Sequence, residues 1–301
     1  MTDLVIRPLE PGEEELFLSF DDPGLVGVAS TGRDFRAYLG ERQYRPEWTW
    51  VAVRGGTVLG RAAWWAGPDD PEPLALDWFD FADPEVGVRL LREAKPRTDF
   101  VFILPAGWRD DPLVRTHARL RIDAARRAGM TPLVERLHYT WTPADGLAER
   151  PARLQYRSEP HDEVIADVVS RVHSVTLDAH ALRTIADGGP EAAARDELEF
   201  FHWMPSPREW WRLAYTPDGS VAGITVPGRN YAGPMIAFVG VVPEQRGHGY
   251  GYDLLVEATH MLVSEGADQV TADTDVSNVA MAAAFARAGY PVTQERVYLK
   301  W

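Results

Sequence analysis

Apolar residues in the second half of the chain recur with two different periods. Three stretches have the 3.6-residue spacing of an amphipathic helix: 164–176, 250–265 and 279–287. Shorter apolar or alternating runs, typical of strands, lie at 211–215, 221–226, 236–242, 270–274 and 292–299. The first two runs flank a Pro-Asp-Gly turn and predict a hairpin, whereas 236–242 is apolar throughout, as in a buried strand. This half is therefore predicted to be α+β, with a mixed central sheet.

The first half of the chain repeats features of the second. Each half ends with an alanine-rich helical run, a glycine and a strand-like tail, and the two endings lie 160 residues apart, as from Gly129 to Gly289. A hairpin signal recurs at an offset of 163 residues, from Gly56 to Gly219. Glycine-capped helix ends also recur by chance, but two matches at similar offsets favour an internal duplication.

The segment between the two halves, 142–151, contains two prolines and a glycine and predicts a linker. We therefore divide the chain into a first domain, 1–145, and a second domain, 146–301. A chain of 301 residues is long enough for two packed cores.

Composition narrows the possible functions. With no cysteine, disulfides, thiolate metal ligands and a cysteine nucleophile are excluded. A net charge of −14 disfavours nucleic acid and anionic membranes as partners, and favours a cationic or neutral substrate. No apolar stretch approaches the roughly 20 residues of a membrane span, and the first residues do not resemble a secretory signal, so we expect a cytoplasmic protein.

A glycine-rich loop joins the predicted strand 236–242 to the predicted helix 250–265. Residues 241–251 read Val-Val-Pro-Glu-Gln-Arg-Gly-His-Gly-Tyr-Gly. Glycines let backbone N–H groups approach a ligand closely, and the positive end of the helix dipole attracts negative charge. The segment therefore predicts a local site for an anion such as a pyrophosphate.

The order Arg246-x-x-Gly249-x-Gly251, after Val-x-Pro, resembles the acyl-CoA loop of the GNAT acyltransferase superfamily. Five further residues follow at the spacing of that superfamily: Asn278, Met281, Phe285, Gly289 and Tyr290. The resemblance covers the second half, and the duplicated layout is similar to that of mycothiol synthase and other tandem GNAT proteins. It implies an α+β fold of two tandem GNAT-like domains, each a mixed, mostly antiparallel sheet flanked by helices.

By this resemblance, the chain is an N-acetyltransferase that transfers an acetyl group from acetyl-CoA to a small-molecule primary amine, without a metal, as a monomer or homodimer. Backbone groups of Val239 and Val241 would hold the pantetheine like an added strand, and Asn278 would contact the pantetheine arm. The pyrophosphate would be bound by the loop residues Arg246, Gly247, His248, Gly249, Tyr250 and Gly251.

Two alternatives for the loop are a dinucleotide-binding fold and a purely structural glycine turn. The glycine spacing is not that of G-x-G-x-x-G, and no run of further βαβ units follows. The first half lacks the loop: Pro84 matches Pro243 at an offset of 159, and Leu90 matches Leu254 at 164, so about five residues are missing. We therefore predict that the first domain is a degenerate copy without the pyrophosphate loop.

Acyl transfer to an amine needs a proton acceptor, because an alkylamine with a pKa near 10.4 is protonated at pH 7. The strand 236–242 offers no carboxylate. Asp273 and Asp275, around the end of the strand 270–274, are the proposed catalytic residues. Their alternative role is to cap the turn before the helix 279–287.

Phe285 departs from the superfamily pattern, in which a tyrosine protonates the leaving thiolate. A free thiol titrates near 8.5, so water or another hydroxyl can supply that proton. Three polar residues that precede the core strands are further candidates for the acceptor cleft: His180, Glu199 and His202. The alternative function is an acyl-CoA-binding sensor or a scaffold protein without turnover.

Overall fold

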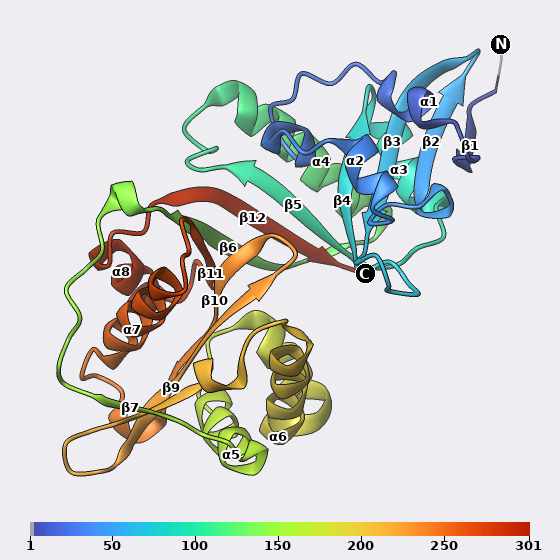
Figure 1. Ribbon diagram of the computed structural model, residues 1–301. Coiled ribbons are helices and arrows are strands. Elements are labelled where there is room, and N and C mark those ends of the chain that lie inside the picture. Colours follow the sequence, from blue (N-terminus) through green and yellow to red (C-terminus); the bar gives the residue numbers. More distant parts are fainter. Residues whose placement is uncertain (1–2) are drawn as a thin grey trace. The chain divides into compact units, whose positions relative to one another are not determined.

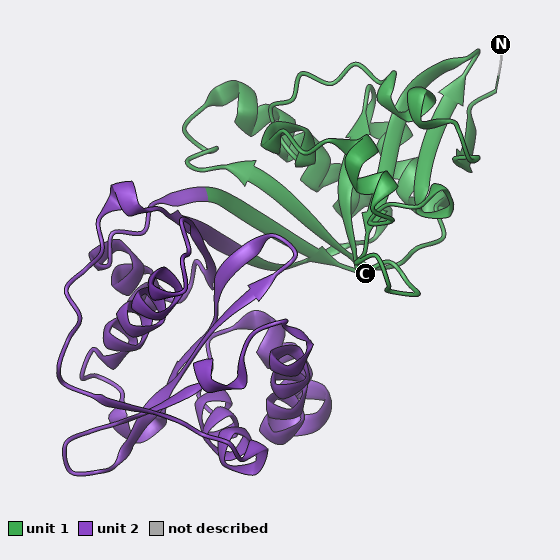
Figure 2. Cartoon of the chain, in the orientation of Figure 1, with its two compact units in different colours: residues 1–135, 294–301 green, residues 136–293 purple. Residues whose placement is uncertain are grey.

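The computed structural model describes residues 3–301, which form two compact units (Figures 1 and 2). Unit 1 contains the residues up to 135 together with 294–301, and unit 2 contains 136–293. No helix among the described residues is both long and apolar enough to cross a bilayer.

The two units differ from the predicted domains 1–145 and 146–301 because each takes a strand from the other half of the sequence. The last strand, β12 (Val292–Lys300), pairs antiparallel with β5 (Asp99–Pro105) in unit 1. Conversely, β6 (Thr131–Trp141) pairs antiparallel with β11 (Val270–Asp275) in unit 2. These two strands are the repeated tails of the two halves of the sequence. Because the tails are similar, each can pair in the position that the other would occupy, as in domain swapping.

Unit 1 is built on a mixed sheet in the order β1-β2-β3-β4-β5-β12, in which only the neighbours β4 and β5 are parallel. Its other strands are β1 (Val5–Pro8), β2 (Thr49–Arg54), β3 (Thr57–Trp65) and β4 (Ala75–Phe81). Its α-helices are α1 (Glu14–Leu18), α2 (Phe35–Gly40), α3 (Pro84–Glu93) and α4 (Pro112–Ala128). The predicted hairpin joins β2 to β3 through Gly55 and Gly56, both with positive φ.

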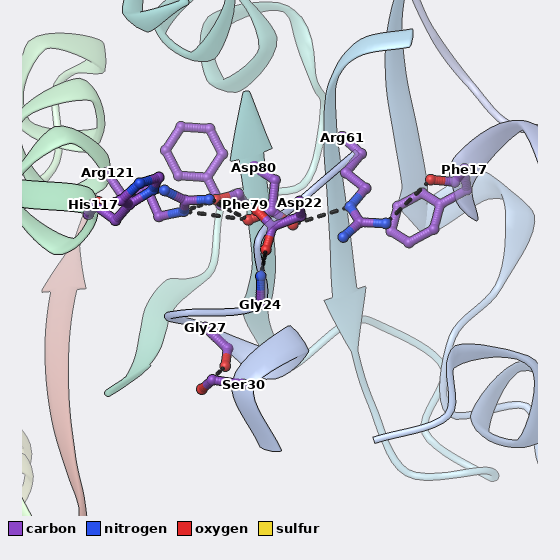
Figure 3. A network of polar contacts seen from close by, with 10 residues as sticks. All are labelled: Phe17, Asp22, Gly24, Gly27, Ser30, Arg61, Phe79, Asp80, His117 and Arg121. Carbon is purple, nitrogen blue, oxygen red and sulfur yellow. Dashed lines mark hydrogen bonds and ion pairs between the residues drawn. The ribbon is translucent and has the colours of Figure 1, made fainter. Parts of the chain in front are cut away.

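A buried ion network ties α4 to the sheet of unit 1 (Figure 3). Arg121 donates to Asp80 and to Asp22, at 2.8 Å in each case, and Arg61 donates to the other oxygen of Asp80 at 3.0 Å. The side chains of all four residues are almost fully buried. Removing one partner would leave a buried charge uncompensated, so this network depends on every member.

Unit 2 is built on a second mixed sheet, in the order β6-β11-β10-β9-β8-β7. Its other strands are β7 (Gln155–Ser158), β8 (Arg212–Tyr215), β9 (Val221–Asn230) and β10 (Gly233–Val241). Its α-helices are α5 (Asp162–His173), α6 (Ala179–Trp203), α7 (Tyr250–Ser264) and α8 (Val279–Arg287). All the helices and strands predicted for this half are present, with ends within a few residues of those expected.

Helix α6 has no counterpart among the helices predicted from the sequence. Its interior contains Gly188-Gly189-Pro190, and Gly189 has φ 80°, so two helical segments meet there at a kink. Glycine and proline ordinarily interrupt a helical pattern, which hid this element.

One feature of the unit 2 sheet shapes the site. Strands β10 and β11 are the parallel neighbours, and their ladder within the described residues is the single pair Met235 and Thr271. On its other edge β10 pairs with β9 from Gly233 to Val241, with a register shift between Ile236 and Phe238. The two parallel strands therefore separate toward the end of β10, and a ligand can enter between them.

Candidate functional site

A cavity of about 940 Å³ lies within unit 2, where β10 and β11 separate. Its walls come from β10, the loop that follows it, the starts of α7 and α8, and the helices α5 and α6. In Figure 1, α7 and α8 lie to one side of β10 and β11, and α5 and α6 to the other. The volume is at the upper end of the range for small-molecule sites.

The glycine loop keeps backbone N–H groups available at the start of α7. Gly247 and Gly249 have φ of 85° and 75°, which glycine adopts without strain. Gly249 is the N-cap residue of α7, and no side chain bonds to the first amides of the helix. A Cβ on Gly247 would meet no atom within 4 Å, so the loop is open. The first amides and the helix dipole together form an anion-binding end.

The loop is anchored from outside by Arg153. Its guanidinium donates to the carbonyl of His248 at 2.9 Å and to the carboxylate of Asp253 at 2.8 Å. Because carbonyls of the loop are bound there, the loop has a fixed backbone conformation. Asp253 is itself buried in the first turn of α7.

Most of the predicted cofactor residues border this cavity. They are Val239, Val241, Arg246, Gly247, Gly249, Tyr250, Gly251 and Asn278. His248 does not border it: its side chain is exposed, and its Nδ1 lies 3.2 Å from the carbonyl of Gln245. Asn278 is the N-cap of α8, where its Oδ1 accepts from the amide of Met281 at 3.2 Å, which leaves its Nδ2 group for another partner.

The corresponding helix start in unit 1 is already capped by a side chain. The side chain of Asp83 caps α3 by accepting from the amide of Glu85 at 2.8 Å, so a carboxylate already occupies the end of the helix. A Cβ on Gly87 would lie 2.4 Å from the ring of Phe81, which therefore packs directly against the helix. Both features distinguish the start of α3 from the start of α7, where no side chain caps the helix.

The side of the cavity formed by α5, α6 and β11 is acidic. Four carboxylates border it: Asp178, Asp196, Glu197 and Asp273. Asp178 pairs with Arg136 at 3.2 Å, and Asp273 lies 3.1 Å from Nδ1 of His138 on β6. The burial of Tyr139, with the negative charge of Asp273 nearby, raises the pKa of Tyr139 to about 12.

The two proposed catalytic carboxylates lie in different surroundings. Asp273 borders the cavity, and its side chain is 24% exposed. Asp275 does not border the cavity; its side chain is 1% exposed, accepts from the amide of Ala179 at 2.7 Å and lies 3.1 Å from Nε of Arg136. Burial raises the pKa of Asp275, and the nearby Asp178 adds to this effect. Asp275 therefore holds the start of α6.

Phe285 is buried and stacks on Tyr139, with ring centroids 4.2 Å apart. It borders the cavity but carries no hydroxyl. Of the three further candidates, His180 borders the cavity, Glu199 does not, and His202 lies outside it, 2.9 Å from Asp162.

Two further residues that border the cavity were not predicted from the sequence, His173 on α5 and Glu197 on α6. His173 is buried on the apolar face of its helix, a position that in a sequence resembles an ordinary core residue. Only the packing of α5 against β10 brings its ring beside Phe238, with centroids 5.8 Å apart.

Comparison with known proteins finds one family model that matches part of the second half. Residues 179–290 match the model of the acetyltransferase (GNAT) family. No curated protein matches the chain significantly.

Solved structures resemble the whole chain. A GCN5-related N-acetyltransferase from Sphaerobacter thermophilus is 15% identical, with a TM-score of 0.59 over 98% of this chain and 94% of that one. A tandem GNAT protein from the clavulanic acid biosynthesis pathway is 17% identical, with a TM-score of 0.52 over 99% of this chain and 98% of that one. These likenesses confirm the predicted α+β fold with tandem GNAT architecture.

Proposed function

We propose that this acyltransferase, which belongs to the GNAT acetyltransferases through residues 179–290, transfers an acetyl group from acetyl-CoA to the primary amine of a small cationic molecule. The observation that carries the proposal is the cavity itself. It joins an open anion-binding loop at the start of α7 to a group of carboxylates on α6 and β11. One end suits the cofactor, and the other suits a positively charged acceptor.

On the donor side, the amides of residues 246–251 would bind the pyrophosphate of coenzyme A. Arg246 and Arg287 also border the cavity and supply local positive charge in a chain of net charge −14. The edge of β10 that faces β11 would bond the pantetheine through Val239 and Val241, as an added strand does. Nδ2 of Asn278 would contact the same arm.

On the acceptor side, carboxylates favour a substrate that arrives as an ammonium ion. Its deprotonation at pH 7 costs about 4.6 kcal/mol for an alkylamine, so transfer needs a proton acceptor. We assign this step to Asp273, which borders the cavity and is oriented by His138. Asp275 contributes indirectly, because it fixes the start of α6, the helix that carries Asp196 and Glu197.

The alternative function, an acyl-CoA sensor without turnover, is separated from the enzyme by one experiment. Release of free thiol from acetyl-CoA is measured with a panel of mono-, di- and polyamines, and acetyl-CoA binding is measured separately by calorimetry. Binding with amine-dependent thiol release supports the transferase. Binding without release for any amine supports the sensor, and no binding contradicts both.

A further inference from the structure

We propose that His173, stabilised by Glu197, carries a proton from the acceptor nitrogen to the departing thiolate of coenzyme A. This inference rests on the proposed acetyl transfer and adds the group that completes it. His173 would be a catalytic residue, and Glu197 a positioning residue that acts through it.

The state of the His173 ring is the first observation. The side chain is 2% exposed, yet it borders the cavity. Neither Nδ1 nor Nε2 has a hydrogen-bond partner. An unsatisfied buried polar group destabilises the folded state, so a ring with two such atoms calls for a functional explanation.

The neighbours of the ring are the second observation. Oε2 of Glu197 lies 3.7 Å from Nε2 of His173, too far for a hydrogen bond but close enough to stabilise a positive charge on the ring. Helices α5 and α6 lie side by side, which brings the two side chains together (Figure 1). The pair would therefore gain its ionic contact only when His173 takes up a proton.

The position of the ring relative to the cofactor is the third observation. His173 packs edge-on against Phe238, the residue before Val239 on β10. In the proposed complex, the backbone of Val239 binds the pantetheine, so the thioester lies at this end of the cavity. A proton on Nε2 would then be held near both the attacked carbon and the sulfur.

The chemistry requires two protons to leave the acceptor. The ammonium loses one to become a nucleophile, and we assign that proton to Asp273. Attack forms the C–N bond and gives a tetrahedral intermediate whose nitrogen carries a positive charge. This nitrogen loses its second proton to Nε2 of His173. The C–S bond then breaks, the electron pair leaves with sulfur, and His173 returns the proton to the thiolate. The products are the amide and coenzyme A thiol.

Two tyrosines that border the cavity, Tyr250 and Tyr252, lie in the first turn of α7, beside the proposed pyrophosphate loop. Phe285 stands where the GNAT superfamily has a tyrosine, and it has no hydroxyl to donate. Four other titratable or charged groups around the acceptor side already have partners: Arg136, Asp178, His180 and Asp273. Asp196 on α6 also borders the cavity, but as a carboxylate it is an acceptor and not a donor at neutral pH.

The first test replaces the ring and keeps a polar side chain. In the full-length protein, His173→Gln should lower kcat by roughly 10²–10⁴-fold and leave the acetyl-CoA Kd within about twofold. The matched control is His161→Gln, an exposed histidine just before α5, which should leave kcat unchanged. A His173→Gln variant with the kcat of the parent overturns the proposal.

The second test supplies a proton donor elsewhere. Phe285→Tyr is introduced into the parent and into His173→Gln. In each background, kcat with the tyrosine is divided by kcat without it, and the two ratios are compared. If His173 serves the thiolate, the tyrosine should raise kcat at least tenfold more in the variant background than in the parent. Equal ratios in the two backgrounds overturn the proposed return step.

The third test concerns Glu197 and uses a readout that a purely structural role would not move. Glu197→Gln should lower kcat and move the acidic limb of the kcat–pH profile to lower pH, because the charged ring loses its counter-ion. An unmoved limb overturns the role of Glu197. If the parent protein binds no acetyl-CoA, the proposed function itself is wrong. If the parent acetylates the amine but all three tests fail, only the role of His173 and Glu197 is wrong.

Discussion

Gly249→Glu is expected to abolish acetyl-CoA binding while the protein stays folded. Gly249 caps the start of α7 at the surface, and a Cβ there would meet only Nη2 of Arg153, at 3.8 Å. Because the residue has φ 75°, the folding cost is the left-handed strain of a non-glycine residue, about 1–2 kcal/mol. This is small against the usual 5–15 kcal/mol stability of a domain.

The expected loss of affinity is larger than the loss of stability. The new carboxylate would lie beside the proposed position of the pyrophosphate, and the nearest cation, Arg153, is already shared with Asp253. Losing two charge-assisted amide contacts, at about 1.5–3 kcal/mol each, removes about 3–6 kcal/mol. Calorimetry should therefore show a Kd at least 100-fold higher, since 1.4 kcal/mol corresponds to a factor of ten.

A matched control separates the site from general effects. Gly219 has φ 87°, lies at the exposed turn between β8 and β9, and has no atom within 4 Å of an added Cβ. Gly219→Glu imposes the same strain and the same charge, so it should bind acetyl-CoA as the parent does. Circular dichroism reports folding in both variants. A folded Gly249→Glu protein with unchanged affinity would refute the loop assignment.

Four further outcomes are expected. Calorimetry should give one acetyl-CoA per chain, because the start of α3 is already capped by Asp83; a stoichiometry near two contradicts this. Asp273→Asn should lower kcat by roughly 10²–10⁴-fold and alter the acidic limb of the pH profile, and full activity would move the first proton acceptor elsewhere. Asp80→Ala should destabilise unit 1 by about 3–5 kcal/mol in chemical denaturation, because it leaves Arg61 and Arg121 buried without their shared partner. Burial raises the pKa of Asp77 to about 6, so the folded protein binds a proton at this carboxyl more tightly than the unfolded chain does. The protonated carboxyl therefore contributes about 3 kcal/mol to the free energy of unfolding below pH 4, and this contribution is lost as the pH rises through 6. Asp77→Asn should flatten that part of the stability–pH curve relative to the parent, and an unchanged slope would contradict the assignment.

The parts of the site that follow from short-range patterns were predictable. The loop 246–251 and the helix behind it are contiguous in sequence, and the glycines, the apolar strand and the amphipathic helix each have a local signature. The cap at Asn278 is likewise local. These features form the proposed donor side, and their local signatures singled out in the sequence a loop that borders the cavity.

The acceptor side depends on contacts between distant residues. Glu197 lies on a helix whose Gly-Gly-Pro interruption hid it, and His173 looks like a core residue until α5 packs against β10. Asp275 and Asp273 are two residues apart and looked equivalent, yet one anchors α6 and the other borders the cavity. Residues two apart on a strand point to the same face, so alternation does not separate these two carboxylates; the packing of the start of α6 against Asp275 does.

The exchange of the two tails is the least predictable feature, and it bears directly on the site. Hydrophobic alternation predicts that a tail is a strand but does not identify its neighbour, because strand pairing is set by contacts far apart in the chain. In unit 2 the neighbour of β11 is β6, a strand encoded before the linker, and register pairs Asp273 with His138. Their side chains approach to 3.1 Å. The first half of the sequence thus contributes a residue that orients the proposed proton acceptor, although its own copy of the cofactor loop is missing. Because β6 pairs with β11, deleting the first half at the linker would remove the strand that carries His138 and would disturb the site.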